Sequence, residues 1–227
     1  MIYIPIFSSN MSTPFDPFLS AATAEASHTY HNTDYIQLRR SWMNEMRSPE
    51  LLPFETDAVE NIIKALRPQW ALISAHQWSR DTYIRDLLVM EADRVSYVLK
   101  SYLRIRLGKI QKFARHYVST RNILSGAELK FAQNLLAVTE QAFSSMFLRH
   151  LPPDDEYFQS LVASDDPGGD MVRRPNLDAV VFVKVTDHIG SIRTGPDETA
   201  DLVKDHSYMI KYALVKDFLH ENRLCLI

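Results

Sequence analysis

The residue types that could bind a metal are few and scattered in this chain. His28 and His31 have a spacing common among metal ligands, but no third ligand lies near them. Asp165, Asp166 and Asp170 fall in a glycine-containing stretch, yet the alternating oxygen ligands and the closing glutamate of a calcium loop are missing. The sequence therefore predicts no metal site, and it favours a solvated linker around the three aspartates.

The residues that could act as acids, bases or nucleophiles are equally isolated. Three histidines lie near predicted helix ends, where a histidine often meets the helix dipole or a carbonyl; they are His76, His116 and His150. Cys225 lies between two leucines, which is typical of a buried structural thiol. The six glycines form neither GxxxxGK nor GxGxxG, the loops that cradle phosphates. We expect no catalytic residues, no cofactor and no enzymatic activity, and a hydrolase assembled from distant His and Asp residues is the weakest alternative.

Basic residues along the longest predicted helix leave a second function open. They are Lys100, Arg104, Lys109, Lys112 and Arg115. Most of them point away from the apolar stripe of that helix, so they form either an ordinary solvated face or a DNA-binding face. A net charge of −3 disfavours a dedicated nucleic-acid binder, so we expect no strong direct DNA binding by the isolated chain. Arg106 differs, because it projects close to the apolar stripe and needs a carboxylate or carbonyl partner once desolvated.

Composition indicates a globular protein. The chain has 227 residues, of which 46% are hydrophobic and 23% charged. A single cysteine excludes a disulfide within the chain and suggests a reducing compartment. The apolar residues 1–7 do not form a secretory signal, since no basic residues precede them, and no apolar run reaches the roughly 18 residues of a membrane span. We expect no membrane association and a cytosolic or nuclear location.

The first two helices are predicted from their start and stop signals. Asp34 followed by Gln37 resembles a capping box and predicts that order begins there, and Pro49 ends this first helix. A second helical pattern runs from about 56 to 78. Pro68 lies inside it and should kink the helix or split it in two.

The longest helical pattern runs from about 81 to 117. Its apolar residues recur at steps of three, four and seven over a wide arc. A small monomer would leave part of this arc exposed, so the helix is expected to pack against neighbours on more than one side. Ser125 and Glu128 form a capping box for a fourth helix, to about residue 150.

A change of composition separates two domains. Residues 152–176 are rich in Pro, Gly and Asp, as linkers are. Beyond them, the sequence predicts strands at 179–185, 206–212 and 223–227, turns near Gly190 and Gly195, and a short helix at 213–220. The predicted fold is therefore mainly α. It has a flexible tail (1–33), a helical domain of four to five helices (34–151), a linker (152–176) and a small β-rich domain (177–227), too small to be very stable alone.

Five stretches carry a resemblance to a known family. They are WMNE and PELL within 42–52, the long-helix run at 90–113, the stretch at 124–132, LRHLPP at 148–153, and the start of the small domain at 175–183. Their order and spacing resemble the Sld-five type of subunit of the GINS complex of eukaryotic DNA replication. Pro68 and residues 1–33 depart from the family pattern.

The resemblance implies a non-catalytic scaffold subunit in the nucleus. Such a chain would assemble with three Psf-type subunits into a heterotetramer, which joins the MCM ring and the Cdc forty-five protein to form the active replicative helicase. In some relatives the N-terminal tail docks on a replisome hub. The alternative is a helical DNA-binding module that uses the basic face around residues 100–115.

The residues expected at partner interfaces or in small-domain packing are apolar, with one arginine. On the helices they are Trp42, Leu99, Tyr102, Leu103, Arg106 and Ile110, and in the small domain Val181, Phe182, Tyr212, Leu224, Leu226 and Ile227. The sequence does not separate internal core from interface within this set.

Overall fold

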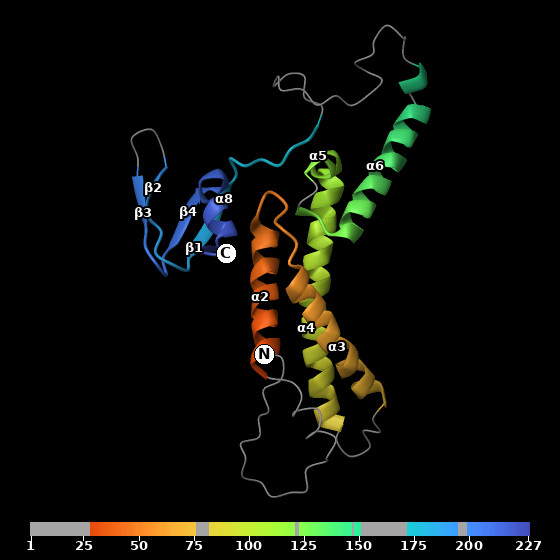
Figure 1. The fold of residues 1–227 in the computed structure, drawn as a ribbon, viewed down its shortest axis with the longest axis vertical. Coiled ribbons are helices and arrows are strands. Elements are labelled where there is room, and N and C mark those ends of the chain that lie inside the picture. The colour runs from red at the N-terminus through yellow and green to blue at the C-terminus, as the bar shows by residue number, and fades with distance from the viewer. Residues whose placement is uncertain (1–27, 76–81, 121–122, 147, 151–171, 195–198) are drawn as a thin grey trace, which may run out of the picture. The chain divides into compact units, whose positions relative to one another are not determined.

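The computed structural model describes residues 28–75, 82–120, 123–146, 148–150, 172–194 and 199–227. It confirms a mainly α fold with a small strand-containing domain at the C-terminal side (Figure 1). The helical elements are α2 (His28–Arg47), α3 (Thr56–Ala75), α4 (Thr82–Lys112), α5 (Ala114–Ser119), α6 (Gly126–Met146) and the 3-10 turn η2 (Leu148–His150). The residues group into two compact units: the part up to Trp42 with Glu55–Tyr102, and Met43–Phe54 with Leu103–Ile227.

In the first unit, α2, α3 and α4 lie side by side (Figure 1). Ile73 of α3 packs in a buried cluster with Leu88 and Ala92 of α4. The indole N–H of Trp42 donates to the hydroxyl of Ser101 at 3.0 Å, which joins α2 to α4. Pro68 lies inside α3 without dividing it, so the predicted split does not occur.

Two of the predicted helix boundaries are wrong. Because α2 begins at His28, Asp34 lies inside the helix and does not cap it, and the Gln37 amide instead donates to Glu55 at 3.0 Å. The helix predicted from about 81 to 117 is interrupted at Phe113, whose φ of −128° and ψ of 34° are not helical. Residues 1–27, which contain most of the predicted tail, and residues 151–171 of the predicted linker lie outside the described residues.

The predicted capping box of the fourth helix is confirmed. The backbone N–H of Ser125 donates to the carboxylate of Glu128 at 2.9 Å, and the backbone N–H of Glu128 donates to the Ser125 hydroxyl at 3.3 Å. Two orphan N–H groups at the start of α6 are thereby satisfied, and the Glu128 side chain is held back over the helix N-terminus.

The small domain contains two antiparallel sheets. One has the strand order β4-β1-β5, from β4 (Ser207–Lys211), β1 (Val180–Val185) and β5 (Leu224–Leu226). The other pairs β2 (Gly190–Arg193) with β3 (Thr199–Leu202), and the helix is α8 (Tyr212–His220). The three predicted strands and the short helix are confirmed, but the β2–β3 pair was predicted only as turns.

The alternation of side chains along β1 gives the larger sheet two different faces. Val181, Val183 and Val185 point inward and are buried. They pack in one core with buried residues of α8, β4 and β5, and with Leu52 from the segment after α2. The alternate residues of β1 point outward and are exposed.

Candidate functional site

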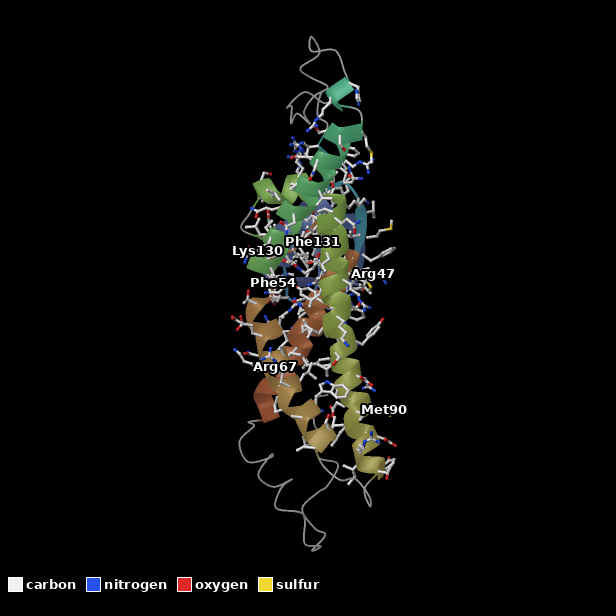
Figure 2. All side chains as sticks on the ribbon, turned by 90° about the vertical axis from the view of Figure 1, so that its right-hand side faces the viewer. Arg47, Phe54, Arg67, Met90, Lys130 and Phe131 are labelled. Carbon is white, nitrogen blue, oxygen red and sulfur yellow. The ribbon has the colours of Figure 1, made fainter. Side chains whose placement is uncertain are left out.

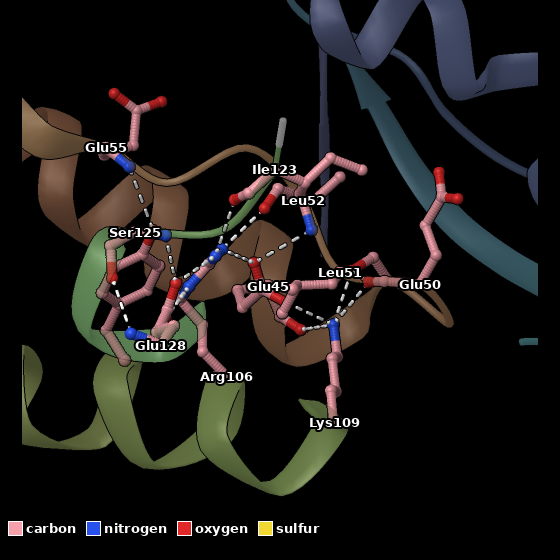
Figure 3. Close-up of polar contacts among 12 residues, drawn as sticks. Glu45, Glu50, Leu51, Leu52, Glu55, Arg106, Lys109, Ile123, Ser125 and Glu128 are labelled. Carbon is pink, nitrogen blue, oxygen red and sulfur yellow. Dashed lines mark hydrogen bonds and ion pairs between the residues drawn. The ribbon is translucent and has the colours of Figure 1, made fainter. Parts of the chain in front are cut away.

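Arg106 of α4 is fully buried, and two carboxylates from distant parts of the chain neutralise it. Its Nη1 lies 3.1 Å from a carboxylate oxygen of Glu45, while Nε and Nη2 lie 2.7 and 3.1 Å from the two oxygens of Glu128 (Figure 3). The guanidinium also donates to the backbone carbonyls of Leu52, at 2.6 Å, and Ile123, at 3.2 Å. The predicted need of Arg106 for a buried carboxylate partner is confirmed.

Lys109, one turn further along α4, completes the same cluster. Its ammonium lies 2.7 Å from Glu45 and 2.7 Å from the Ser48 hydroxyl, and it donates to the Glu50 carbonyl at 2.8 Å. Burial lowers the pKa of Lys109, and the neighbouring Glu45 carboxylate opposes this shift. We call Glu45, Arg106, Lys109 and Glu128 the Arg106 cluster. Its two cations and two carboxylates balance, as burial of charge requires.

Helix geometry explains why these side chains face inward. Arg106 lies four residues after Tyr102 and four before Ile110, and both of these are buried, so all three share one side of α4. Glu45 lies seven residues after the buried Leu38, which places it on the inner side of α2. The capping box directs Glu128, so one carboxylate both caps α6 and binds Arg106.

A second carboxylate, that of Glu50, connects the segment after α2 to the small domain. It accepts a hydrogen bond from the Tyr212 hydroxyl at 2.8 Å and another from the Lys216 ammonium at 2.9 Å. Burial, together with the nearby Glu50 charge, raises the pKa of Tyr212. The side-chain oxygen of Asn44 accepts a hydrogen bond from the backbone N–H of Leu226 at 2.9 Å, so this N–H at the edge of β5 is satisfied.

A tyrosine in the helical part holds the same segment. The Tyr117 hydroxyl accepts the backbone N–H of Leu51 at 2.9 Å. Leu51 and Tyr117 also belong to a buried cluster with Ile110 and Ala132. Burial raises the pKa of Tyr117 to about 12. Residues 44–52 therefore form a strap that is fixed by α4, α5 and α6 as well as by the small domain.

The ion pairs of this arrangement connect α2, α4 and α6 and have a structural role. The charged groups of the Arg106 cluster are paired with one another, so none is poised to attack or to transfer a proton to a ligand. Within the described residues, no group of three or more His, Cys, Asp and Glu side chains could hold a metal ion. Asp165, Asp166, Asp170 and His76 lie outside those residues, and so do the side chains of His28 and His31. Among the helices that the structure describes, none is long and apolar enough to cross a membrane.

Comparison with known proteins finds the same family in both halves of the chain. Residues 79–147 match the GINS complex protein helical bundle domain, and residues 175–227 match the DNA replication complex GINS protein SLD5 C-terminus. The human DNA replication complex GINS protein SLD5 is 30% identical over 205 residues, which cover 84% of this chain and 87% of the human protein. The cattle protein of the same name is 32% identical over 206 residues, covering 84% and 87%. The Schizosaccharomyces pombe protein is 29% identical over 202 residues, covering 86% and 92%.

This chain belongs to the Sld5 family of GINS subunits. The resemblance predicted from the five sequence stretches is confirmed by matches to both domains. Membership gives the chain a role in DNA replication as a subunit of the GINS complex.

The structure distributes the predicted interface residues of this Sld5 family member over core and surface. Two of them, Trp42 and Leu103, are half-buried, and two others, Phe182 and Ile227, are exposed. The other eight are buried within the chain itself: Leu99, Tyr102, Arg106, Ile110, Val181, Tyr212, Leu224 and Leu226. Those eight side chains pack inside the chain, and the other four lie at least partly at its surface.

Several large apolar side chains outside the predicted interface set are exposed. Tyr83, Leu87, Met90 and Tyr97 are exposed on the first half of α4. Met90 projects on the side of α4 turned away from α3 (Figure 2). The signal was the wide apolar arc of this helix, which required more neighbours than one chain supplies.

The basic residues of α4 and α5 do not form one continuous basic face. Lys100, Arg104 and Lys112 are exposed. Lys109 is turned into the Arg106 cluster, and Arg115 pairs with Glu140 at 3.0 Å. Of the five side chains that defined the predicted DNA-binding face, two therefore pair with carboxylates of this chain and three are exposed.

Proposed function

We propose that this chain is a non-catalytic scaffold subunit of a nuclear, heterotetrameric GINS complex, whose other members are three Psf-type subunits. The assembled tetramer joins the MCM ring and the Cdc forty-five protein to form the active replicative DNA helicase, at initiation and during fork progression. ATP hydrolysis and strand separation belong to the MCM ring, and this chain contributes binding surface.

One contrast supports the proposal: the buried charges of this chain are paired with one another, while large apolar side chains are exposed on its surface. The chain also matches the Sld5 family over both domains. The Arg106 cluster is internally paired and offers no reactive group. Large apolar side chains such as Tyr83 and Phe182 are exposed at 75% and 60%. Long-lived subunit interfaces are larger and more apolar than the rest of a protein surface, so side chains of this kind suit a permanently assembled chain.

The test is co-expression of this chain with three Psf-type subunits, followed by size-exclusion chromatography with light scattering. We expect one copy of each chain in a single peak, and retention of that tetramer on an immobilised MCM ring only when the Cdc forty-five protein is present. A monomeric chain that elutes apart from the three subunits would overturn the proposal. Tetramer formation without binding to the ring would limit it to assembly.

Leu103 provides a sharper variant of this test. It is half-buried on α4, next to the buried Tyr102. We expect Leu103→Asp to prevent recovery of the tetramer, because it would place a carboxylate in an apolar contact. Arg104→Asp, at the adjacent exposed position, is the matched control and should assemble normally.

The N-terminal tail is a further part of the proposal. We infer that residues 1–33 contribute binding to a replisome hub, as in some relatives. A chain lacking residues 1–27 should still form the tetramer but bind the hub less tightly. Unchanged hub binding would refute this role.

DNA binding is the alternative function, and only the exposure of Lys100, Arg104 and Lys112 supports it. Three phosphate contacts would give a logarithmic salt slope of about −3 on duplex DNA. Measurement of duplex affinity at several salt concentrations decides the matter. Affinity that is weak and lost at physiological salt would leave the scaffold function alone.

A further inference from the structure

The outer side of the three-stranded sheet is apolar where a solvated face should be polar. Strand pairing sets Phe182 opposite Met209 and Val180 opposite Lys211. On the other side of β1, Lys184 pairs with Cys225. Side chains alternate between the faces of a sheet, so these positions share one side. We call it the outer sheet face: Val180, Phe182, Lys184, Ser207, Met209, Lys211, Cys225 and Ile227.

The central side chains of this face are well exposed. Val180, Phe182, Met209 and Ile227 have exposed fractions of 57%, 60%, 66% and 45%. The domain does not need them for its own core, since the opposite face already packs against α8. An antiparallel sheet with one solvated face normally carries polar residues there. A group of adjacent exposed apolar side chains instead marks an interaction surface.

The charges on the face indicate which partner it fits. Lys211 lies opposite Val180 at one end, and Lys184 lies at the other end of β1. None of the eight side chains of the face is acidic, and the exposed carboxylate of Asp178, beside the face, lies 3.8 Å from the Lys211 ammonium. An apolar centre between two lysines complements an apolar segment with carboxylates at its ends.

The dimensions and the sheet edges favour a helix over a strand as the partner. Val180 and Lys184 are four residues apart, about 13 Å along a strand, which is roughly the length of two to three helical turns. A strand would add to an edge of the sheet, whereas a helix packs across a face. At the β5 edge, the backbone N–H of Leu226 already donates to Asn44.

We propose that the outer sheet face binds an acidic amphipathic helix of another GINS subunit. The helix presents apolar residues at i, i+3 or i+4 and i+7 to Phe182 and Met209, with Asp or Glu near Lys184 and Lys211. This inference rests on the proposed function, because it requires the assembled complex.

The first experiment uses the complete complex of four co-expressed chains. Lys184→Glu with Lys211→Glu should weaken retention of one partner subunit by about tenfold or more at low salt. Phe182→Asp should do the same, whereas Val203→Asp, at an exposed apolar position outside the face, should have no effect. Charge reversal of the acidic residues in the partner helix should restore binding to the lysine double variant.

The second experiment does not depend on disruptive variants. Met209→Cys, in a chain whose Cys225 is replaced by Ser, should react with a maleimide in the isolated chain and become protected by about tenfold or more in the complex. A photo-crosslinking amino acid at Val180 should form an adduct with an acidic, amphipathic helical segment of one of the other subunits.

The outcomes separate this inference from the proposed function. If the unaltered four chains never co-purify, both fail. If they co-purify, but the variants assemble normally and Met209→Cys stays as reactive as in the isolated chain, only this inference fails. An adduct with a basic segment, with a strand, or with a second copy of this chain would also overturn it.

Discussion

The Arg106 cluster and the outer sheet face both depart from the usual placement of residues, in which apolar side chains are buried and charged side chains are exposed. In the cluster, the charged side chains of Glu45, Arg106 and Glu128 are buried and that of Lys109 is partly buried, where apolar residues normally pack. On the sheet face, Phe182, Met209 and Val180 lie outside, where polar residues normally face water. The charges of the cluster are paired within the chain, whereas the sheet face is exposed and carries Lys184 and Lys211 at its ends.

The difference separates two tasks of one subunit. Buried ion pairs add little net stability over apolar packing, but the loss of one member leaves an uncompensated charge. The cluster therefore restricts how α2, α4 and α6 can be arranged. An exposed apolar face contributes nothing to the isolated chain and becomes favourable only when a partner covers it. Substitutions should consequently affect folding in the first region and assembly in the second.

The largest effect is expected from removal of residues 224–227, which deletes β5. Leu224 and Leu226 are buried at 0% and 2% exposure, and the loss of each costs about 2 to 5 kcal/mol. A domain of this size has only a few kcal/mol of stability, so it should unfold. Limited proteolysis should then cut within 177–223. Removal of Ile227 alone, which is half exposed, should leave the domain resistant; equal sensitivity of both variants would contradict the prediction.

Arg106→Ala should destabilise the helical part by about 3 to 5 kcal/mol, because Glu45 and Glu128 would be left buried and unpaired. Arg104→Ala, two residues earlier and exposed, should change the free energy of unfolding by less than about 0.5 kcal/mol. Urea-induced unfolding measures both. Similar values for the two variants would show that the cluster is dispensable. Combining Arg106→Met with Glu45→Gln and Glu128→Gln should recover part of the loss.

Alkaline pH should weaken the fold through its buried tyrosines. The pKa of Tyr117 rises from 10.0 to about 12, so the folded state keeps a proton that the unfolded chain loses near pH 10. The stabilisation is complete below pH 10 and is lost as the pH rises through 12, an effect of about 2 to 3 kcal/mol. Urea unfolding between pH 9 and pH 12 should show the decline, and Tyr117→Phe should reduce it, while the part that Tyr212 contributes stays. A decline of the same size in Tyr117→Phe would assign it to other groups.

Glu50→Gln should have a smaller effect, because it removes the negative charge but leaves an oxygen that can accept a hydrogen bond. The carboxylate accepts from Tyr212 and Lys216, and the amide oxygen can keep the first of these bonds. We expect a loss of about 1 to 2 kcal/mol. Glu60→Gln, which changes an exposed pair with Lys64, is the control and should cost about 0.5 kcal/mol or less. Thermal unfolding of the two variants provides the measurement, and equal melting temperatures would count against the Glu50 contact.

The smallest effect is expected from the outer sheet face in the isolated chain. Phe182→Asp should change the free energy of unfolding by about 0.5 kcal/mol or less, since the side chain is 60% exposed. The same variant should impair assembly strongly. If it instead unfolds the isolated domain, the face contributes to folding and the contrast with the Arg106 cluster disappears.

Local signals in the sequence predicted much of the fold. The capping box at Ser125 and Glu128, the β-branched run before Val185 and the stop at Pro49 all act over a few residues, and the structure retains them. The β2–β3 pair was missed because its four-residue strands, such as Gly190–Arg193, contain no long apolar or β-branched run. The start of α2 was placed at Asp34, because a capping pattern inside a helix looks the same as one at its beginning.

The candidate site was predicted only in part. Arg106 was visible because a charge on an apolar stripe is a conflict within one helix. Glu45 carried the same signal on α2, seven residues after Leu38, and could have been found in that way. The pairing itself joins residues 61 positions apart, and no local pattern specifies such a contact. Glu50 gave no signal, because its partners belong to the other domain.

The strap at residues 44–52 also sets an order of events on the ribosome. The residues that complete the Arg106 cluster have all been made once Glu128 has emerged, so the helices can close around Arg106 early. The partners of Glu50 and Asn44 follow much later, since Glu50 and Lys216 are 166 residues apart and Asn44 and Leu226 are 182 apart. During that interval the nascent chain carries a carboxylate and a leucine, Leu52, whose packing site has not yet been translated. The emerging chain should accordingly depend on chaperones most while residues 150–220 are being synthesised.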